Sequence, residues 1–419
     1  MASQLFVFMA ISSRGLGGSY IYMNNKLRYY AKLGWDTLLI HANSYSVNDA
    51  IPGLSEFDNN YDLRLRMPPG YFSDATRKRV LSSLIERFYL RKYDKILIES
   101  SELYMALWAE MLAKELNAKH LVFLLSEHNA INSKSMFDFL EFKASRVELA
   151  GITKVSIPQL FNGWETTLNL KELVLPAYSS NCIGDVDYPL IDEIPKANHL
   201  ISIIGRVRKP FIYQAINDVA QYIKSYPEKR FVLLIVGGST DDKLYFSKFL
   251  KESFSTIENA QYFVTGPIYP IPLSLLKKPD VVISSAGACA AAAKLGKLVI
   301  SYDANDLCPI GIYKVTTEHT IFRGPDEPAL DLKALLDDIL VNGRYHEFET
   351  DFDVEKENDI DFSSHDLFLE KSSQDKVYFD ISKISLSIKD RLLSLPVKIL
   401  GAKLGSDMLE NYYRIRQKI

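Results

Sequence analysis

The sequence predicts an α/β protein built from two Rossmann-like halves, each with a parallel sheet covered by helices on both faces. The chain has 419 residues, more than the roughly 250–300 residues beyond which a single hydrophobic core stops growing. Short apolar runs alternate with longer amphipathic runs through residues 1–180, as in strands and helices around a parallel sheet. The alternation stops at residues 181–197 and then begins again.

The first half, residues 1–180, is predicted to begin with a strand at residues 5–11. This apolar run has no basic region before it and is shorter than a signal peptide requires, so we interpret it as a strand. A glycine-rich turn follows, and the next helix, at residues 20–33, ends at Gly34. Further strands are expected at residues 37–41, 95–99 and 120–125, and further helices at residues 75–91 and 103–116.

Residues 181–197 are polar and proline-rich without periodicity, so they are interpreted as a linker. The second half, residues 198–345, repeats the strand–helix alternation. Its strands are expected at residues 200–204, 231–236, 261–265, 281–284 and 298–301, and its helices at residues 213–225 and 243–254 and in the alanine-rich run after residue 285.

Two charged segments follow the second half. Residues 346–380 form an acidic segment, in which residues 347–362 carry eight acids and one lysine; a solvated loop explains this composition. Residues 381–419 are predicted to be helical and basic. Two interpretations remain open for them: a helix that crosses back onto the first half, or a peripheral contact of residues 383–418 with an anionic membrane surface.

Composition restricts the partners and the compartment. The net charge of −3 shows no basic excess of the kind that nucleic-acid binding requires. Cys182, Cys289 and Cys308 are odd in number and widely spaced, which favours a reducing compartment, the cytoplasm. No apolar run approaches the ~20 residues of a membrane-spanning helix. We therefore expect a cytoplasmic protein that at most lies peripherally on the inner face of a membrane.

Two such halves form a cleft at the carboxyl ends of their strands, where helix N-termini bind anions. Gly17 and Gly18 follow the first strand and let the backbone approach a ligand closely. As a dinucleotide fingerprint this turn is poor, because a third glycine is missing and the second strand ends in His41-Ala42-Asn43 without an acid. The sequence therefore argues against a dehydrogenase.

The first strand of the second half ends in Gly205 and is followed by Arg206, Arg208 and Lys209. Arginine is a planar two-pronged donor and lysine a point charge, so this loop suits a pyrophosphate; a solvated loop is the alternative. The small residues 285–288 after a later strand would leave a helix N-terminus open to phosphates, although close helix packing explains them as well.

In the first half, the residues at the strand ends are the candidates for the acceptor side of the cleft. His128 can act as a general base or bind a sugar or phosphate, although a lone histidine is more often structural. Glu99 ends the strand at residues 95–99 and is expected to touch an acceptor or serve as base. Glu127 follows the strand at residues 120–125 and is also a candidate for the acceptor side.

From its start to about residue 330, the chain resembles the GT-B glycosyltransferases of the "group 1" type. The resemblance rests on short segments that occur in the family's order. They lie at residues 14–18, 33–35, 126–128, 175–176, 203–206, 234–238, 264–266 and 295–299.

The resemblance implies two Rossmann-like domains that face a cleft and bind a nucleotide-diphosphate sugar, with the C-terminal segment returning to the first domain. By the family's roles, Gly17, Gly18, Arg206 and Lys209 contact the diphosphate. The catalytic candidates are His128, Arg206 and Lys209, and the donor-binding candidates are Gly17, Gly18, Gly205, Arg208, Gly237, Gly266, Ser285, Ala286, Gly287, Ala288 and Asp303.

The chain departs from the family pattern at the donor ribose. The family carries two glutamates eight positions apart; the second stands where this chain has Ala291, and no glutamate occurs between residues 280 and 296. Residues 284–288 are more similar to the S-x-A-G turn of the GlcNAc transferase of peptidoglycan synthesis. Asp303 or Glu318 is then the candidate that holds the ribose.

We therefore expect a glycosyltransferase that uses a nucleotide sugar and a glycan or lipid-linked acceptor, in surface polysaccharide or glycoconjugate synthesis. Two alternatives stay open: a nucleotide-sugar epimerase on the same fold, and a non-catalytic scaffold, which the missing glutamates favour. No cofactor and no metal is expected, because Asp185-Val186-Asp187 lies in the linker and Asp351-Phe352-Asp353 in the acidic segment.

Overall fold

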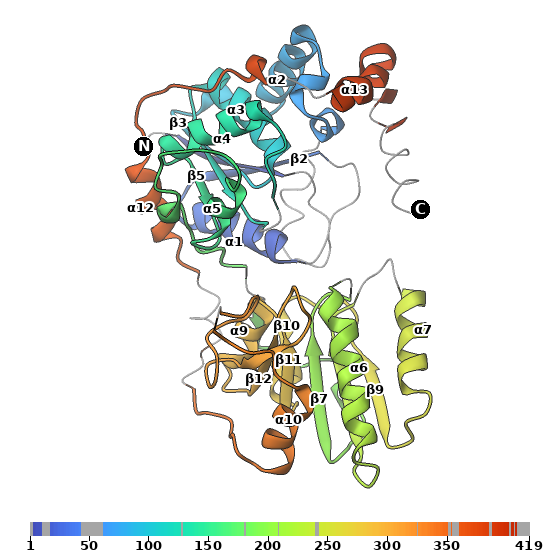
Figure 1. Ribbon diagram of the computed structural model, residues 1–419. Helices are drawn as coiled ribbons and strands as arrows, with labels where there is room; N and C mark the ends of the chain where they lie inside the picture. The colour runs from blue at the N-terminus through green and yellow to red at the C-terminus, as the bar shows by residue number, and fades with distance from the viewer. Residues whose placement is uncertain are drawn as a thin grey trace.

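The computed structural model contains two separate parallel sheets, one in each half of the chain (Figure 1). The structure describes residues 3–10, 17–42, 62–126, 129–179, 182–207, 209–238, 243–324, 326–350, 353, 360–384, 388–401, 404–405 and 407–408.

The N-terminal sheet has five parallel strands in the order β2-β1-β3-β4-β5. Its elements in chain order are β1 (Gln4–Ala10), α1 (Gly18–Lys32), β2 (Asp36–His41), α2 (Asp74–Arg87), β3 (Lys95–Ser100), α3 (Leu103–Leu116), β4 (Lys119–Leu124), α4 (Lys134–Ser145) and β5 (Leu149–Gly151), with the 3₁₀ turns η2 (Leu63–Arg66), η3 (Pro69–Tyr71) and η4 (Leu90–Lys92). The predicted strands and helices of this half are confirmed within a few residues at each end, while α4 and β5 were not predicted.

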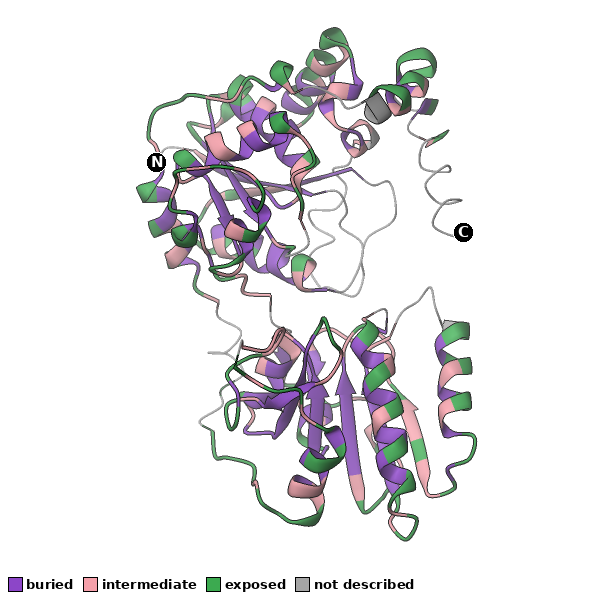
Figure 2. Cartoon of the chain, in the orientation of Figure 1, coloured by how far each residue is buried: buried purple, intermediate pink, exposed green. Residues whose placement is uncertain are grey.

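Strand β1 shows why the strands of this sheet are apolar on both faces. Phe6 and Phe8 lie in the core cluster on one face of the sheet, and Val7 and Met9 lie in the cluster on the other. Successive side chains of a strand point to opposite faces, so a sheet covered by helices on both sides buries every position. Figure 2 shows these buried strands between helices whose outer faces are exposed.

The C-terminal sheet has six strands in the order β9-β8-β7-β11-β12-β13. In chain order this is 3-2-1-4-5-6, the arrangement of a Rossmann sheet, with β13 antiparallel to β12. Its elements are β7 (His199–Ile204), α6 (Pro210–Lys224), β8 (Phe231–Val236), α7 (Lys243–Phe254), β9 (Ala260–Val264), α8 (Leu273–Lys277), β11 (Val281–Ser284), α9 (Gly287–Ala293), β12 (Val299–Tyr302), β13 (Pro309–Ile312) and α10 (Leu332–Leu336).

Two differences from the predicted C-terminal half have simple physical reasons. Helix α6 begins at Pro210 and not at residue 213, because proline fits the first turn of a helix, where its missing N–H is not needed. A short parallel pair, β6 (Ile183–Gly184) with β10 (Ile271–Pro272), ties the predicted linker to this half. Strands this short leave no recognisable pattern in a sequence.

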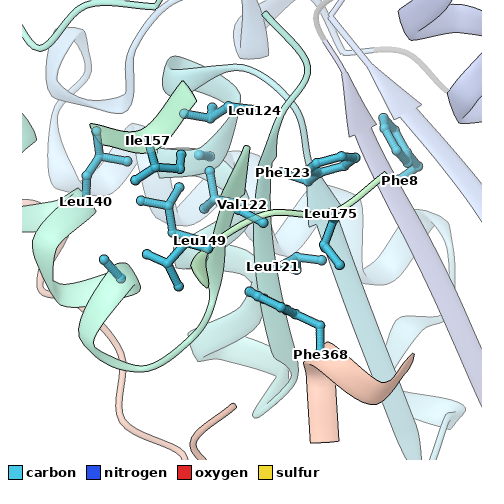
Figure 3. Close-up of a cluster of buried hydrophobic side chains, with 14 of the residues drawn as sticks. Phe8, Leu121, Val122, Phe123, Leu124, Leu140, Leu149, Ile157, Leu175 and Phe368 are labelled. Atoms are coloured by element: carbon cyan, nitrogen blue, oxygen red, sulfur yellow. The ribbon is translucent and has the colours of Figure 1, made fainter. Parts of the chain in front are cut away.

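The chain returns to the N-terminal sheet after the second half. Helix α12 (Ser363–Lys371) and the residue before it place Phe362, Phe368 and Leu369 in the same core cluster as Leu121 of β4. Figure 3 shows Phe368 beside Leu121 at this contact. Farther on, helix α13 (Ile388–Leu400) buries Val397 against the opposite face of the sheet. The predicted return of the C-terminal segment is confirmed, and with it the GT-B fold class.

Polar contacts fix α12 on α1. The carboxylate of Asp366 accepts hydrogen bonds from the hydroxyls of Tyr29, at 2.6 Å, and Tyr30, at 2.9 Å. His365 is fully buried, and its Nε2 donates to the carbonyl oxygen of Pro176 at 2.9 Å. Its Nδ1 has no hydrogen-bond partner among the described residues. Burial, assisted by the charge of Lys26, lowers the pKa of His365 to about 3.

We expect His365 to destabilise the protein in acid. The unfolded chain takes up a proton near the ordinary histidine pKa of 6.5, whereas the folded chain does so only near 3, so the free energy of unfolding falls as the pH falls between these values. From pH 7 to pH 4 the loss should be about 3 kcal/mol. Urea unfolding of the wild type and of His365→Gln at both pH values measures it. Equal pH dependence in the two proteins would contradict the assignment.

Across the described residues, every helix is too short or too polar to cross a membrane.

Candidate functional site

A cavity of about 140 Å³ lies between the two halves, at the carboxyl ends of β7, β8 and β11 and at the N-terminus of α1. It falls between β7 and β11, where the chain order of the strands reverses, and ligands of such sheets bind at that point. Its lining residues are Gly17, Gly18, Ser179, Ile204, Gly205, Arg206, Lys209, Val236, Gly237, Gly238, Pro267, Ile268, Ile271, Ser285, Ala286, Gly287 and Ala288.

The first half contributes the start of α1. Gly17 is the N-cap of this helix, in an extended conformation, and its carbonyl oxygen accepts from the N–H groups of Tyr20 and Ile21. A Cβ at Gly17 would lie 2.8 Å from Nη1 of Arg206, so the guanidinium of the second half lies directly against this backbone. Glycine at this position leaves room for the close approach of the arginine.

The second half brings two backbone turns together. The N–H of Gly205 donates to the carbonyl oxygen of Val236 at 3.0 Å, which extends the pairing of β7 with β8 up to the cavity. Gly237 has a φ of +135°, and a Cβ there would overlap the carbonyl oxygen of Gly205. The positive φ and the close approach of the Gly205 carbonyl oxygen explain why a glycine follows β8. With glycines at 205 and 237, this part of the cavity wall is formed by backbone.

The turn between β11 and α9 is strained. Ala286 has a φ of +61° with a ψ of −139°, a region that residues with a Cβ rarely adopt and that costs on the order of 1–3 kcal/mol. Two hydrogen bonds to the carbonyl oxygen of Thr320 hold it, from the Ala286 N–H at 2.7 Å and the Ser285 hydroxyl at 3.1 Å. Such strain is concentrated at functional sites.

The cavity is electropositive. Arg206 and Lys209 supply two cations, and no carboxylate belongs to the lining that the structure describes. Burial, and then the neighbouring charge of Arg206, lowers the pKa of Lys209. An anion between the two side chains would offset their repulsion. The volume is below the roughly 300–1,000 Å³ of a pocket for a whole ligand, so it suits the charged part of a larger one.

Substitution of Gly17 by alanine should weaken anion binding and leave the fold unchanged. The extended backbone tolerates a Cβ, but the added methyl group would push the flexible end of Arg206 out of its place. We expect the Kd for a nucleoside diphosphate to rise roughly fivefold, which corresponds to about 1 kcal/mol. Titration calorimetry measures it. Ser82→Ala, which changes an exposed side chain of α2 away from the cavity, serves as the control.

Most of the predicted diphosphate-binding residues converge on this cavity. It brings together Gly17, Gly18, Gly205, Arg206, Lys209, Gly237, Ser285, Ala286, Gly287 and Ala288. Three predicted site residues, Arg208, Glu127 and His128, lie outside the described residues. Gly266 is adjacent to the cavity but not in its lining: its Cα lies 3.1 Å from the position of a Cβ on Gly238.

The structure places Glu99 away from the cavity, in the core. Its carboxylate is fully buried beneath α1, accepts a hydrogen bond from the Tyr22 hydroxyl and lies 3.9 Å from Nζ of Lys26. Burial raises the pKa of Glu99 and lowers that of Lys26 to about 8. Contact of Glu99 with an acceptor, as its strand-end position suggested, does not agree with this burial.

Asp303 also lies outside the cavity lining. Its Oδ1 accepts from the N–H groups of Asn305 and Asp306, and its Oδ2 accepts from the N–H of Arg323 at 2.7 Å. The side chain is 5% exposed, so it organises its own loop and has little surface left for a ribose. Glu318, the other ribose candidate, is exposed and paired with Lys314.

Sequence reasoning missed the remaining part of the wall, formed by Ser179, Ile204, Val236, Gly238, Pro267, Ile268 and Ile271. Gly238 follows Gly237 directly, and this pair of glycines after a strand could have indicated that Gly238 also lines the cavity. Ser179 and the residues 267–268 come from irregular segments, where no periodicity marks a position. Within the described residues, no three histidine, cysteine or acidic side chains are close enough to hold a metal ion.

Comparison of the sequence with family models and with curated proteins finds no match. Among solved structures, the chain is similar to a glycosyltransferase from Rickettsia africae, with 14% identity, a TM-score of 0.57, and coverage of 89% of this chain and 94% of that one. That likeness shows a shared fold.

Two further structures show weaker likeness. HepE of Anabaena, in complex with UDP-glucose, has 14% identity and a TM-score of 0.46 over 70% of this chain and 79% of that one. The UDP-GlcNAc 2-epimerase of Neisseria meningitidis, bound to UDP-GlcNAc, has 15% identity and a TM-score of 0.44 over 88% and 99%.

Proposed function

We propose that the protein is a glycosyltransferase that moves a sugar from a nucleotide-diphosphate donor to a glycan or lipid-linked acceptor. The observation that carries the proposal is the electropositive cavity between the halves, in which the N-terminus of α1 meets Arg206 and Lys209. A diphosphate presents the charge and size that this cavity accepts, and the rest of a nucleotide sugar would extend into the space between the sheets.

In the proposed reaction a hydroxyl of the acceptor attacks the anomeric carbon of the donor sugar, and the bond from that carbon to the diphosphate oxygen breaks. Negative charge builds on the departing diphosphate. Arg206 and Lys209 stabilise that charge, and preorganised donors of this kind account for much of the catalysis in many enzymes. His128 is our candidate for the base that takes the acceptor proton. We propose that the reaction requires no metal and takes place in the cytoplasm, in surface polysaccharide or glycoconjugate synthesis.

A thermal-shift screen against UDP, GDP, dTDP and CMP tests the proposal. A ligand that binds the native state raises the melting temperature, so one or more of the three diphosphates should do so while CMP, with a single phosphate, should have less effect. The sugar nucleotide of the best diphosphate is then supplied with and without acceptor glycans. Absence of any shift would refute the donor site.

Ala291 favours a second candidate, a non-catalytic scaffold or binding protein on the same fold. In the resemblance to the group 1 family, the ribose-binding glutamate falls at this position, and here it is an alanine buried inside α9. Titration calorimetry in which neither UDP nor GDP binds would support this candidate, since a scaffold need not bind a nucleotide. Conversion of UDP-GlcNAc without any acceptor would indicate the epimerase instead.

A further inference from the structure

Helix α13 has an apolar face that is exposed. Leu392, Leu395 and Ile399 are three and four residues apart and therefore share one side of the helix. Leu392 is 63% and Ile399 75% exposed. On the opposite side, Leu393 and Val397 pack against the N-terminal core cluster. The exposed face is thus the one that points away from the protein.

Further exposed apolar side chains occur at the end of the helix and after it. Leu400, Leu404 and Met408 are also exposed, so six large apolar side chains stand in solvent within residues 392–408. Contiguous exposed apolar surface, such as that on the outer side of α13, marks an interaction site. We call these six residues the apolar stripe.

Exposed cations occur on α2 and just after it, in the same half of the molecule as the apolar stripe. Helix α2 packs on the same core cluster as α13, through Val80, Leu81, Leu84 and Ile85, and Figure 1 shows both helices at the same end of the molecule. Residues 74–92 carry six arginines and lysines against two acids. The exposed cations of this segment, which we call the basic patch, are Lys78, Arg79, Arg87, Arg91 and Lys92.

We propose that the apolar stripe and the basic patch together dock the protein on an anionic lipid bilayer, with α13 lying in the plane of the interface. An amphipathic helix binds in this way, with its apolar face buried among the acyl chains and its cations at the headgroups. A second copy of the chain fits less well, because a two-fold contact through this surface would place one basic patch against the other. The proposal is independent of the sugar transferred.

Sedimentation of the full-length protein with vesicles tests the docking. Vesicles of phosphatidylcholine alone are compared with vesicles that also contain phosphatidylglycerol, at low and at high salt. We expect binding to the anionic vesicles, weakened by salt. Leu392→Ser with Ile399→Ser should weaken binding roughly tenfold, since it removes apolar area from the interface. Arg79→Gln with Arg87→Gln should weaken it by about fivefold for each cation removed.

The control variant is Leu244→Ser, which changes an aliphatic side chain 90% exposed on α7 of the other half and should bind vesicles like the wild type. All variants change exposed side chains, and an unchanged melting temperature confirms that each is folded. The proposal is overturned if the wild type does not bind anionic vesicles, or if Leu392→Ser with Ile399→Ser binds them as well as the control does. A wild-type dimer that Leu392→Ser with Ile399→Ser dissociates would also overturn it, in favour of a second copy of the chain.

Discussion

Replacing Arg206 by alanine is expected to lower kcat roughly 10²–10³-fold while the protein stays folded. The loss of one preorganised donor that stabilises developing charge has this magnitude in other enzymes. Arg206 is exposed at the cavity, against the backbone of Gly17, so its removal takes no side chain out of a core. Steady-state release of UDP or GDP from the cognate sugar nucleotide, together with the melting temperature, provides the measurement.

Arg230→Ala is the matched control for this experiment. Arg230 is also exposed, but it precedes β8 and therefore lies at the opposite edge of the same sheet. Its removal should leave kcat within a factor of about two, since surface substitutions away from special features change little. If the kcat of Arg206→Ala equalled that of Arg230→Ala, the diphosphate would have to bind elsewhere.

Replacing Lys143 by methionine is expected to destabilise the protein by about 3–5 kcal/mol, because removal of one partner leaves buried charges uncompensated. Nζ of Lys143 lies 3.0 Å from the carboxylate of Glu110 and 2.6 Å from that of Glu148, and it donates to the carbonyl oxygen of His120 at 2.9 Å. Lys143, Glu110 and His120 are all buried.

The pKa of Glu110 reports how strongly this group depends on the lysine. Burial alone would raise it, but Lys143 and then His120 lower it to about 2. Without Lys143 the burial effect should dominate, and the carboxyl should titrate at a much higher pH. Urea unfolding at neutral pH measures the loss of stability. The control is Lys114→Met, on the exposed side of α3, which should change stability by less than about 0.5 kcal/mol. An equally small effect of Lys143→Met would show that the buried ion pairs of Lys143 contribute little to stability.

The fold and much of the cavity lining were predictable, because both follow from order along the chain. Apolar strands alternate with helices, and the carboxyl ends of parallel strands meet at one edge. The loops that begin at Gly17, Gly205, Gly237 and Ser285 were therefore expected together, and the cavity joins them.

The errors came from side-chain direction, which strand order does not give. Glu99 is the last residue but one of β3, and it is two residues from Leu97 and so points to the same face, under α1. Asp303 follows β12, yet its carboxylate turns back to the N–H groups of its own loop, as aspartate commonly does in turns. A count of alternating positions would have exposed the first error.

The return of α12 to the first sheet has a consequence for biosynthesis. Phe362, Phe368 and Leu369 complete a core whose other members begin with Phe6, so the half that leaves the ribosome first is finished last. The whole second half leaves the ribosome before α12 does. During translation, apolar surface on the early strands therefore stays exposed until the last part of the chain has been made. Intermediates with exposed apolar surface are the ones that chaperones protect.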